Sequence, residues 1–289
     1  MDRRHKGHIA QNIFGNFYGS GVDPLSKLKE AMRHILYPAA RWVLDLEPNA
    51  FQIDRCSQLR YRTLDGIVPA DNVTDPLPDE FKNVKLGSRA LYKLVSDFNF
   101  QTVLDIGCGE GNHATVLANH GKNVTALDYG TSPYYNLRGA NFNAVVGDFN
   151  TLDFSIQFDA IWASHVLEHQ LNPHYFLKKI HNITKENGVV AITVPPLKHI
   201  IVGGHVTLWN AGLLLYHLVH AGFNCSNASI LQYGYNISVI VKKQTVTGID
   251  YIFDMGDIRS IRKYLPVGLD YRNEELDDPF DGDIHRLNW

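Results

Sequence analysis

Cysteine, net charge and long apolar runs are all scarce in this 289-residue sequence. The three cysteines, Cys56, Cys108 and Cys225, are odd in number and scattered, which argues against a disulfide framework. A formal net charge of −3 provides no bulk attraction for nucleic acid. The most apolar stretch, LWNAGLLLYHLVHAGF, is too short and too rich in Asn and His to cross a bilayer.

The N-terminal sequence MDRRHKGHIA is basic, but no apolar core follows it, so it does not have the pattern of a secretory signal. Hydrophobic residues make up 45% of the chain and charged residues 20%, as in an ordinary globular protein. We therefore expect a cytoplasmic protein with no nucleic-acid partner and no membrane span.

Short apolar segments alternate with helical patterns from Ser88 onward. Strands are predicted over 102–106, 123–127, 143–147, 158–164 and 188–194, and residues 230–243 predict a strand pair with a tight turn near Gly234. This alternation predicts an α/β fold, a Rossmann-like, doubly wound, mostly parallel sheet with helices on both faces.

The regular alternation sets the expected domain boundaries. Residues 88–245 are predicted to form the α/β domain, with an N-terminal addition over 1–87 and a C-terminal addition over 246–289. The first addition has a helical pattern beginning near Asp23 and several aromatic residues, which would suit a lid over a pocket or a homodimer contact. The acidic run over 273–283 is expected to be a solvated segment.

The segment VLDIGCGEGN, residues 103–112, places Gly107, Gly109 and Gly111 directly after a predicted strand. Clustered glycines indicate a sharp turn or a close approach of the backbone to a ligand. The dinucleotide pattern G-x-G-x-x-G requires a glycine at position 112, where this chain has Asn112. Asp105, inside the strand, would repel a pyrophosphate and suits an amine or a bound water better.

Two further acids follow the next predicted strands. Asp128 ends the second strand, where a carboxylate can accept both hydroxyls of an adenosine ribose. Asp148 follows the third strand and is placed for an adenine amino group, with Phe149 beside it to pack on the ring. The third acid is not part of the dinucleotide pattern.

With these motifs in this order, residues 88–241 resemble the class I S-adenosylmethionine-dependent methyltransferases. The segment FDAIWASHVLEH also stands in the order of that family, and LKKIHNITKENGVVAITVPP, His205 and LLLYHLVHAGF resemble the branch that modifies small molecules and sugars. The resemblance implies S-adenosylmethionine as the cofactor. It implies cofactor contacts from Asp105, Gly107, Cys108, Gly109, Gly111, Asp128, Tyr129, Asp148, Phe149 and Ser164.

Histidines follow the fourth and fifth predicted strands. The segment HVLEH, residues 165–169, matches the zinc-protease pattern H-x-x-E-H, but it begins at the end of a sheet strand and methyltransferases carry similar sequences without zinc, so we expect no metal there. Glu168 and His169 are expected to stabilise this turn. The resemblance places His165 beside the reactive end of the cofactor and His205 at the acceptor, which makes them the candidate catalytic residues.

The predicted activity is methyl transfer to a small molecule, with a hydroxyl of a sugar or sugar nucleotide in surface-polysaccharide synthesis as the favoured acceptor. The tail FDGDIHRLNW and the His205 region carry this preference, because they resemble methyltransferases of that kind. Two alternatives stay open. One is a non-catalytic subunit that binds S-adenosylmethionine, and the other is a dinucleotide-dependent oxidoreductase.

Overall fold

The computed structural model describes residues 73, 75–131, 135, 141–249, 257–271 and 279–289. The chain divides into two compact units, residues 1–62 and 63–289, and every described residue belongs to the second. The helical pattern near Asp23 and the aromatic residues of the N-terminal addition lie outside the described residues, as does most of the acidic run over 273–283.

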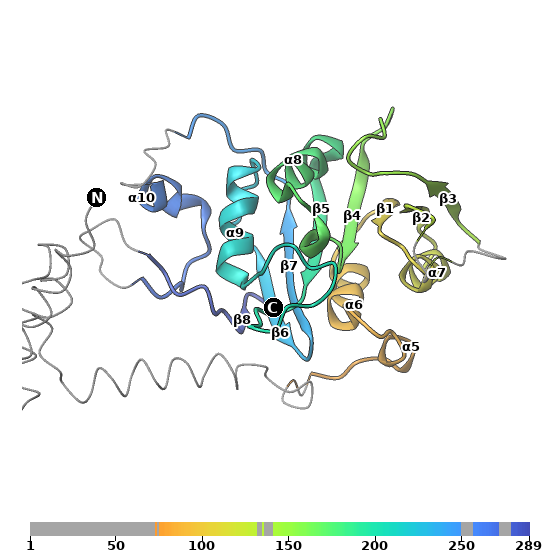
Figure 1. Cartoon of the computed structure of the whole chain (residues 1–289), viewed down its shortest axis with the longest axis horizontal. Coiled ribbons are helices and arrows are strands. Elements are labelled where there is room, and N and C mark those ends of the chain that lie inside the picture. The colour runs from red at the N-terminus through yellow and green to blue at the C-terminus, as the bar shows by residue number, and fades with distance from the viewer. Residues whose placement is uncertain (1–72, 74, 132–134, 136–140, 250–256, 272–278) are drawn as a thin grey trace, which may run out of the picture. The chain divides into compact units, whose positions relative to one another are not determined.

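The second unit is built on a twisted eight-stranded sheet with the order β3-β2-β1-β4-β5-β7-β6-β8 (Figure 1). The strands are β1 (Thr102–Ile106), β2 (Asn123–Asp128), β3 (Asn143–Val146), β4 (Phe158–Ser164), β5 (Thr184–Val194), β6 (Ser229–Tyr233), β7 (Asn236–Lys242) and β8 (Arg286–Leu287). The ladders among β1 to β5 are parallel, and β7 joins β5 in the antiparallel sense. The predicted mostly parallel α/β fold is thus present.

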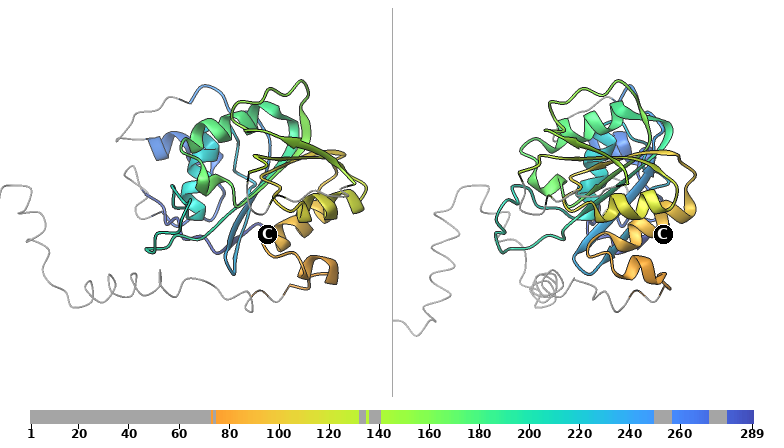
Figure 2. Two further views of the ribbon diagram at one scale, coloured as in Figure 1. Left: turned by 45° about the vertical axis from the view of Figure 1, so that its right-hand side comes forward. Right: turned by 90° about the vertical axis from the view of Figure 1, so that its right-hand side faces the viewer.

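Helices cover both faces of this sheet. They are α5 (Asp79–Lys82), α6 (Ser88–Asp97), α7 (Asn112–Asn119), α8 (Pro173–Ile183), α9 (Ala211–His220) and α10 (Asp257–Ile261), with short 3-10 turns η2 (Leu167–His169) and η3 (Arg262–Tyr264). Both views of Figure 2 place α6 and α7 on one side of the strands and α8 and α9 on the other.

The two faces have separate apolar cores, because side chains alternate along each strand. On β1, Val103 packs with the helices α6 and α7, whereas Leu104 packs with α8 and α9. On β4, Trp162 packs on the side of α6 and α7 and Ile161 on the side of α8 and α9, and both are fully buried. This burial on both faces explains why the strands read as continuous apolar runs.

The C-terminal segment completes the sheet, because β8 pairs with the edge strand β6 in the antiparallel sense. The amide of Gly212 in α9 donates to the carbonyl of Gly282 at 2.9 Å. A Cβ on Gly212 would lie 2.5 Å from the Cα of Gly282, so only glycine allows this approach. The compact unit over 63–289 includes both expected boundaries, at 87/88 and 245/246, and the division at these positions stays a prediction.

Strand β5 begins earlier than predicted, at Thr184 rather than Gly188. Thr184 pairs with Phe158 of β4, and the register then shifts before Ala160 meets Val189. The irregular segment includes Asn187, which has a positive φ of 63°. A polar segment with a local bulge does not show the apolar pattern of a buried strand, so this part of β5 could not be predicted from the sequence.

Candidate active site

A cavity of about 770 Å³ lies beyond the carboxyl ends of β1, β2 and β4. This edge of a parallel sheet is where open α/β folds bind ligands. The loop after β1, the end of β2 and the turn after β4 form its walls, and Val202, His205 and Tyr235 line it from the loop after β5 and the turn after β6.

The glycine loop after β1 folds back on the end of β2. All three glycines have left-handed backbone conformations, with φ of 73° at Gly107, 51° at Gly109 and 75° at Gly111. A Cβ on Gly107 would lie 2.4 Å from Val166, so a larger residue would displace the turn after β4. The amides of Gly107 and Cys108 donate to the carbonyl of Leu127. The loop therefore needs glycine both for its backbone conformation and for its packing.

Asp128 connects this loop to the end of β2. Its Oδ2 accepts a hydrogen bond from the amide of Gly109, and its Oδ1 accepts one from the amide of Gly130, both at 3.0 Å. The carboxylate is only 9% exposed and lines the cavity. An anionic acceptor held by two amides is positioned without any rearrangement to accept further hydrogen bonds from hydroxyl groups of a ligand.

Asp105 lies under the glycine loop and is 1% exposed. Among the described residues, its Oδ2 has no hydrogen-bond partner. Burial raises the pKa of Asp105 to about 7, and the charge of Asp128 adds to this rise, whereas the Ala114 amide opposes it. A buried carboxyl with one unused oxygen fits a ligand amine better than an anionic group.

Asparagine at position 105 should remove a pH dependence of stability. Between the usual pKa of 3.8 and the folded pKa of about 7, the folded protein holds a proton that the unfolded chain releases. The free energy of unfolding therefore falls as pH rises through this window. Denaturant unfolding of wild type and Asp105→Asn between pH 4 and 8 measures the difference. Parallel curves for the two proteins would contradict the raised pKa.

The end of β3 is arranged differently from the ends of β1 and β2. Asp148 Oδ1 accepts hydrogen bonds from the hydroxyl of Tyr129 at 3.1 Å and from the amide of Asn150 at 2.8 Å. Phe149 is 5% exposed, packs against Phe176 with ring centroids 4.9 Å apart, and still contributes to the cavity wall. Tyr129 is the exposed member of this group, so that Asp148 orients a tyrosine that itself lines the cavity.

His165 occupies the first position after β4 with a positive φ of 56°. Its Nε2 lies 3.1 Å from Oδ1 of Asn236, and its Nδ1 lies 3.3 Å from Oε1 of Glu168. Its ring stacks on Tyr235 with centroids 5.8 Å apart. A left-handed conformation at a non-glycine residue is uncommon and often marks a functional position.

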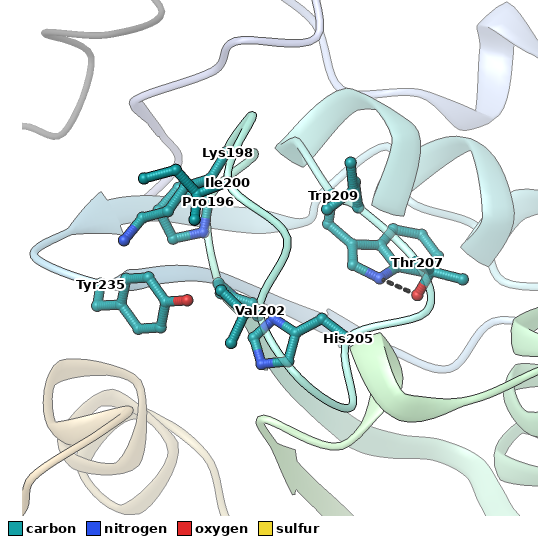
Figure 3. Close-up of a pocket in the computed structure, with 10 residues that line it drawn as sticks. Pro196, Lys198, Ile200, Val202, His205, Thr207, Trp209 and Tyr235 are labelled. Atoms are coloured by element: carbon teal, nitrogen blue, oxygen red, sulfur yellow. Dashed lines mark hydrogen bonds between the residues drawn. The ribbon is translucent and has the colours of Figure 1, made fainter.

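His205 lies in the loop after β5, and its backbone amide donates to the carbonyl of Val202. Partial burial lowers its pKa, with further lowering by His169, His165 and Lys198 against the opposing effect of Glu168. Figure 3 shows His205 facing a small pocket next to the main cavity, with Val202 and Tyr235 nearby. The ammonium group of Lys198 lies 4.2 Å from the centroid of the Tyr235 ring.

The structure brings most of the predicted site residues to one cavity. Those that line it are Gly107, Cys108, Gly109, Asp128, Tyr129, Phe149, Ser164, His165 and His205. Asp105, Gly111 and Asp148 are not among the lining residues: Asp105 lies below the loop, Gly111 is the residue before the first turn of α7, and Asp148 bonds Tyr129. The cofactor contacts and catalytic roles predicted for all of these residues, lining or not, stay predictions.

Sequence reasoning missed the supporting roles of two residues. Tyr235 comes from the β6–β7 turn, and Asn236 accepts from the amide of Gly87 while it also contacts His165. No local pattern marks either position. The expected role of Glu168 in stabilising its turn stays a prediction. Its side chain accepts no hydrogen bond from the described residues but lies 3.3 Å from His165, and its backbone carbonyl accepts from the amides of Val206 and Thr207 and from the Thr207 hydroxyl.

Comparison with known proteins places the similarity on the same segment. Residues 104–192 match the family model described as a methyltransferase domain. A ubiquinone biosynthesis O-methyltransferase of Rickettsia conorii is 32% identical over 107 residues, which are 35% of this chain and 37% of that protein. An (S)-coclaurine N-methyltransferase of Papaver somniferum is 30% identical over 142 residues, 40% of each chain. The chain thus spans well under half the length of these relatives.

Among solved structures, the chain is similar to the 1,6-didemethyltoxoflavin-N1-methyltransferase of Burkholderia thailandensis with bound 1,6-didemethyltoxoflavin and S-adenosylhomocysteine. It has a TM-score of 0.46 and 19% identity, covering 68% of this chain and 91% of that one. No helix within the described ranges is long and apolar enough to cross a membrane. The family match over 104–192 spans the glycine loop, Asp128 and the turn after β4 that form the cavity described above.

Proposed function

We propose that this protein transfers the methyl group of S-adenosylmethionine to a small-molecule acceptor. The observation that carries the proposal is the single cavity in which the glycine loop, the Asp128 carboxylate and two histidines meet, within the segment that matches a methyltransferase domain. The cofactor supplies a methyl carbon already activated by its sulfonium.

The residues present fit this cofactor. The left-handed backbone of the glycine loop lines the cavity at Gly107 and Gly109, and the buried Oδ2 of Asp105 has no partner among the described residues. The loop glycines would hold the amino acid part and Asp128 the ribose, with Tyr129 and Phe149 near the adenine. The carboxylate of Asp128 accepts hydrogen bonds only, which suits hydroxyl groups and disfavours a pyrophosphate.

The chain's own chemical task is to align the acceptor and to remove its proton. His205 is our proposed proton acceptor, with His165 as the alternative. Both line the cavity, and the lowered pKa of His205 keeps its ring neutral near pH 7.

For the acceptor we propose a hydroxyl of a sugar or sugar nucleotide used in surface-polysaccharide synthesis in the cytoplasm. The small pocket lined by Lys198, Thr207 and Tyr235 holds only about 10 Å³, and Lys198 already lies 4.2 Å from the Tyr235 ring, so a sugar would have to lie in the main cavity. The relatives compared above are an O-methyltransferase and an N-methyltransferase. An amine is therefore the alternative acceptor that experiments have to include. A homodimer contact through residues 1–87 stays part of the proposal.

Ligand-dependent stability tests the cofactor. S-Adenosylhomocysteine should raise the melting temperature of the full chain, and NADH should not, because a ligand that binds only the native state stabilises it by about 2.7 kcal/mol at a hundred times its Kd. Stabilisation by NADH alone would favour an oxidoreductase. Binding of S-adenosylhomocysteine without any turnover of S-adenosylmethionine on sugar nucleotides, phenols or amines would favour a non-catalytic subunit.

A further inference from the structure

The turn after β4 buries the carboxylate of Glu168. Histidine rings face this carboxylate, and no hydrogen-bond donor among the described residues contacts it. Glu168 is fully buried, and within the described part of the chain neither of its oxygens accepts a hydrogen bond. Its Oε1 lies 3.3 Å from Nδ1 of His165 and 3.8 Å from Nε2 of His169. A buried carboxylate is costly unless a positive group faces it, so the arrangement needs a cation or protonated rings.

The proton of the neutral His169 ring is committed elsewhere. Its Nδ1 lies 2.7 Å from the carbonyl oxygen of Gly204, which can only accept, so Nδ1 must donate. In the neutral ring, Nε2 then carries a lone pair and points toward Glu168. A histidine that donates its second nitrogen to a backbone carbonyl is the usual arrangement for a metal ligand, because this bond fixes the tautomer and the ring orientation.

His165 is arranged in the same sense. Asn236 donates from Nδ2 to the carbonyl of Tyr233, and its Oδ1 accepts from the amide of Gly87. This orientation makes Oδ1 an acceptor for Nε2 of His165, so the neutral ring turns the lone pair of Nδ1 toward Glu168. Two imidazole lone pairs therefore face one carboxylate oxygen.

His205 supplies a third ligand atom from a different segment. The ligand atoms of Glu168, His169 and His205 all lie within 4.8 Å of one another. The rings of His169 and His205 meet edge to face with centroids 5.0 Å apart. The ligand atoms of a tetrahedral zinc ion lie about 3.4 Å apart when each zinc–ligand distance is about 2.1 Å. Side-chain movements on the order of 1 Å would therefore bring the three ligand atoms to zinc-binding distances.

We propose that Glu168, His169 and His205 bind a divalent transition-metal ion, for which zinc is the best match. Two imidazole nitrogens and one carboxylate leave a further coordination position open, as in catalytic zinc sites, whereas magnesium prefers oxygen ligands. All three residues line the cavity, so the open position faces it. The sequence expectation of no metal considered His165 and His169 of one turn and could not include His205, which only the fold brings to them.

The role of the metal rests on the proposed function. The open position would take the acceptor oxygen or a water and lower its pKa, as bound divalent ions do. His205 would then be a ligand and not the proton acceptor.

Direct metal titration tests the site without any activity measurement. The full chain is treated with a chelator and titrated with Zn²⁺ by calorimetry and with Co²⁺ by visible absorption. We expect one ion per chain, and we expect Glu168→Gln and His205→Ala each to weaken binding at least about a hundredfold. His199→Asn, which changes an exposed histidine of the same loop outside the cluster, should bind the metal like wild type.

The result that overturns the proposal is wild-type binding no tighter than that of His205→Ala, a variant of a half-exposed loop residue that should fold even where Glu168→Gln does not. Metal binding by Glu168→Gln as tight as that of the wild type would also overturn the proposal. Protonated histidine rings would then have to balance the buried Glu168 carboxylate. S-Adenosylhomocysteine binding is measured on the same samples. A wild-type chain that binds S-adenosylhomocysteine but no metal refutes this site alone, and a wild-type chain that binds the metal but no S-adenosylhomocysteine refutes the proposed cofactor alone.

Discussion

Alanine at position 128 is expected to reduce the affinity for S-adenosylhomocysteine by at least about a hundredfold. Hydrogen bonds to a charged acceptor contribute about 1.5–3 kcal/mol each, and the ribose would lose two of them. The variant also releases the amides of Gly109 and Gly130, which donate to the carboxylate at 3.0 Å. Calorimetric titration with S-adenosylhomocysteine measures the loss.

Two further variants separate the ribose contact from the support of the loop. Asp128→Asn keeps one acceptor oxygen and should retain part of the affinity. Asp153→Asn removes an exposed acid outside the cavity and should leave affinity unchanged. Thermal unfolding without ligand reports the cost of the freed amides separately. If Asp128→Ala bound S-adenosylhomocysteine like wild type, the cofactor would have to lie elsewhere than at the end of β2.

Replacing His205 should lower turnover by roughly a hundredfold or more while the affinity for S-adenosylhomocysteine stays near that of wild type, since general-base catalysis has this magnitude. His205 lines the cavity and the small pocket beside it, and it is distant in sequence from the glycine loop and Asp128. Single-turnover rates with the true acceptor, measured for His205→Asn and His205→Ala, give the effect on chemistry apart from binding.

Metal content decides which role His205 has. If His205 is a base, its replacement leaves the metal affinity of the protein unchanged. If His205 is a metal ligand, its replacement weakens metal binding. His199→Asn serves as the control, because it lies in the same loop and is exposed. Turnover that persists in both His205 variants would exclude both roles and would leave His165 as the residue that serves the acceptor.

The strands and the glycine loop followed from local sequence patterns. Continuous apolar runs such as those of β1 and β4 indicate strands buried on both faces, and the structure places them in the centre of the sheet. Gly107, Gly109 and Gly111 have the left-handed conformations that a cluster of glycines indicates. Asp128 could be located from sequence because it follows a strand whose end is fixed by that same pattern.

Only the tertiary structure joined residues whose distance along the chain carries no periodic signal. His205 reaches Glu168 and His169 because the loop after β5 folds over the turn after β4, through backbone bonds from Val206 and Thr207. Asn236 fixes His165 across 71 positions, and β8 joins a sheet that begins 184 residues earlier, from Thr102 to Arg286. Local propensity is set by neighbours in sequence, whereas such contacts depend on the packing of the whole sheet and its loops.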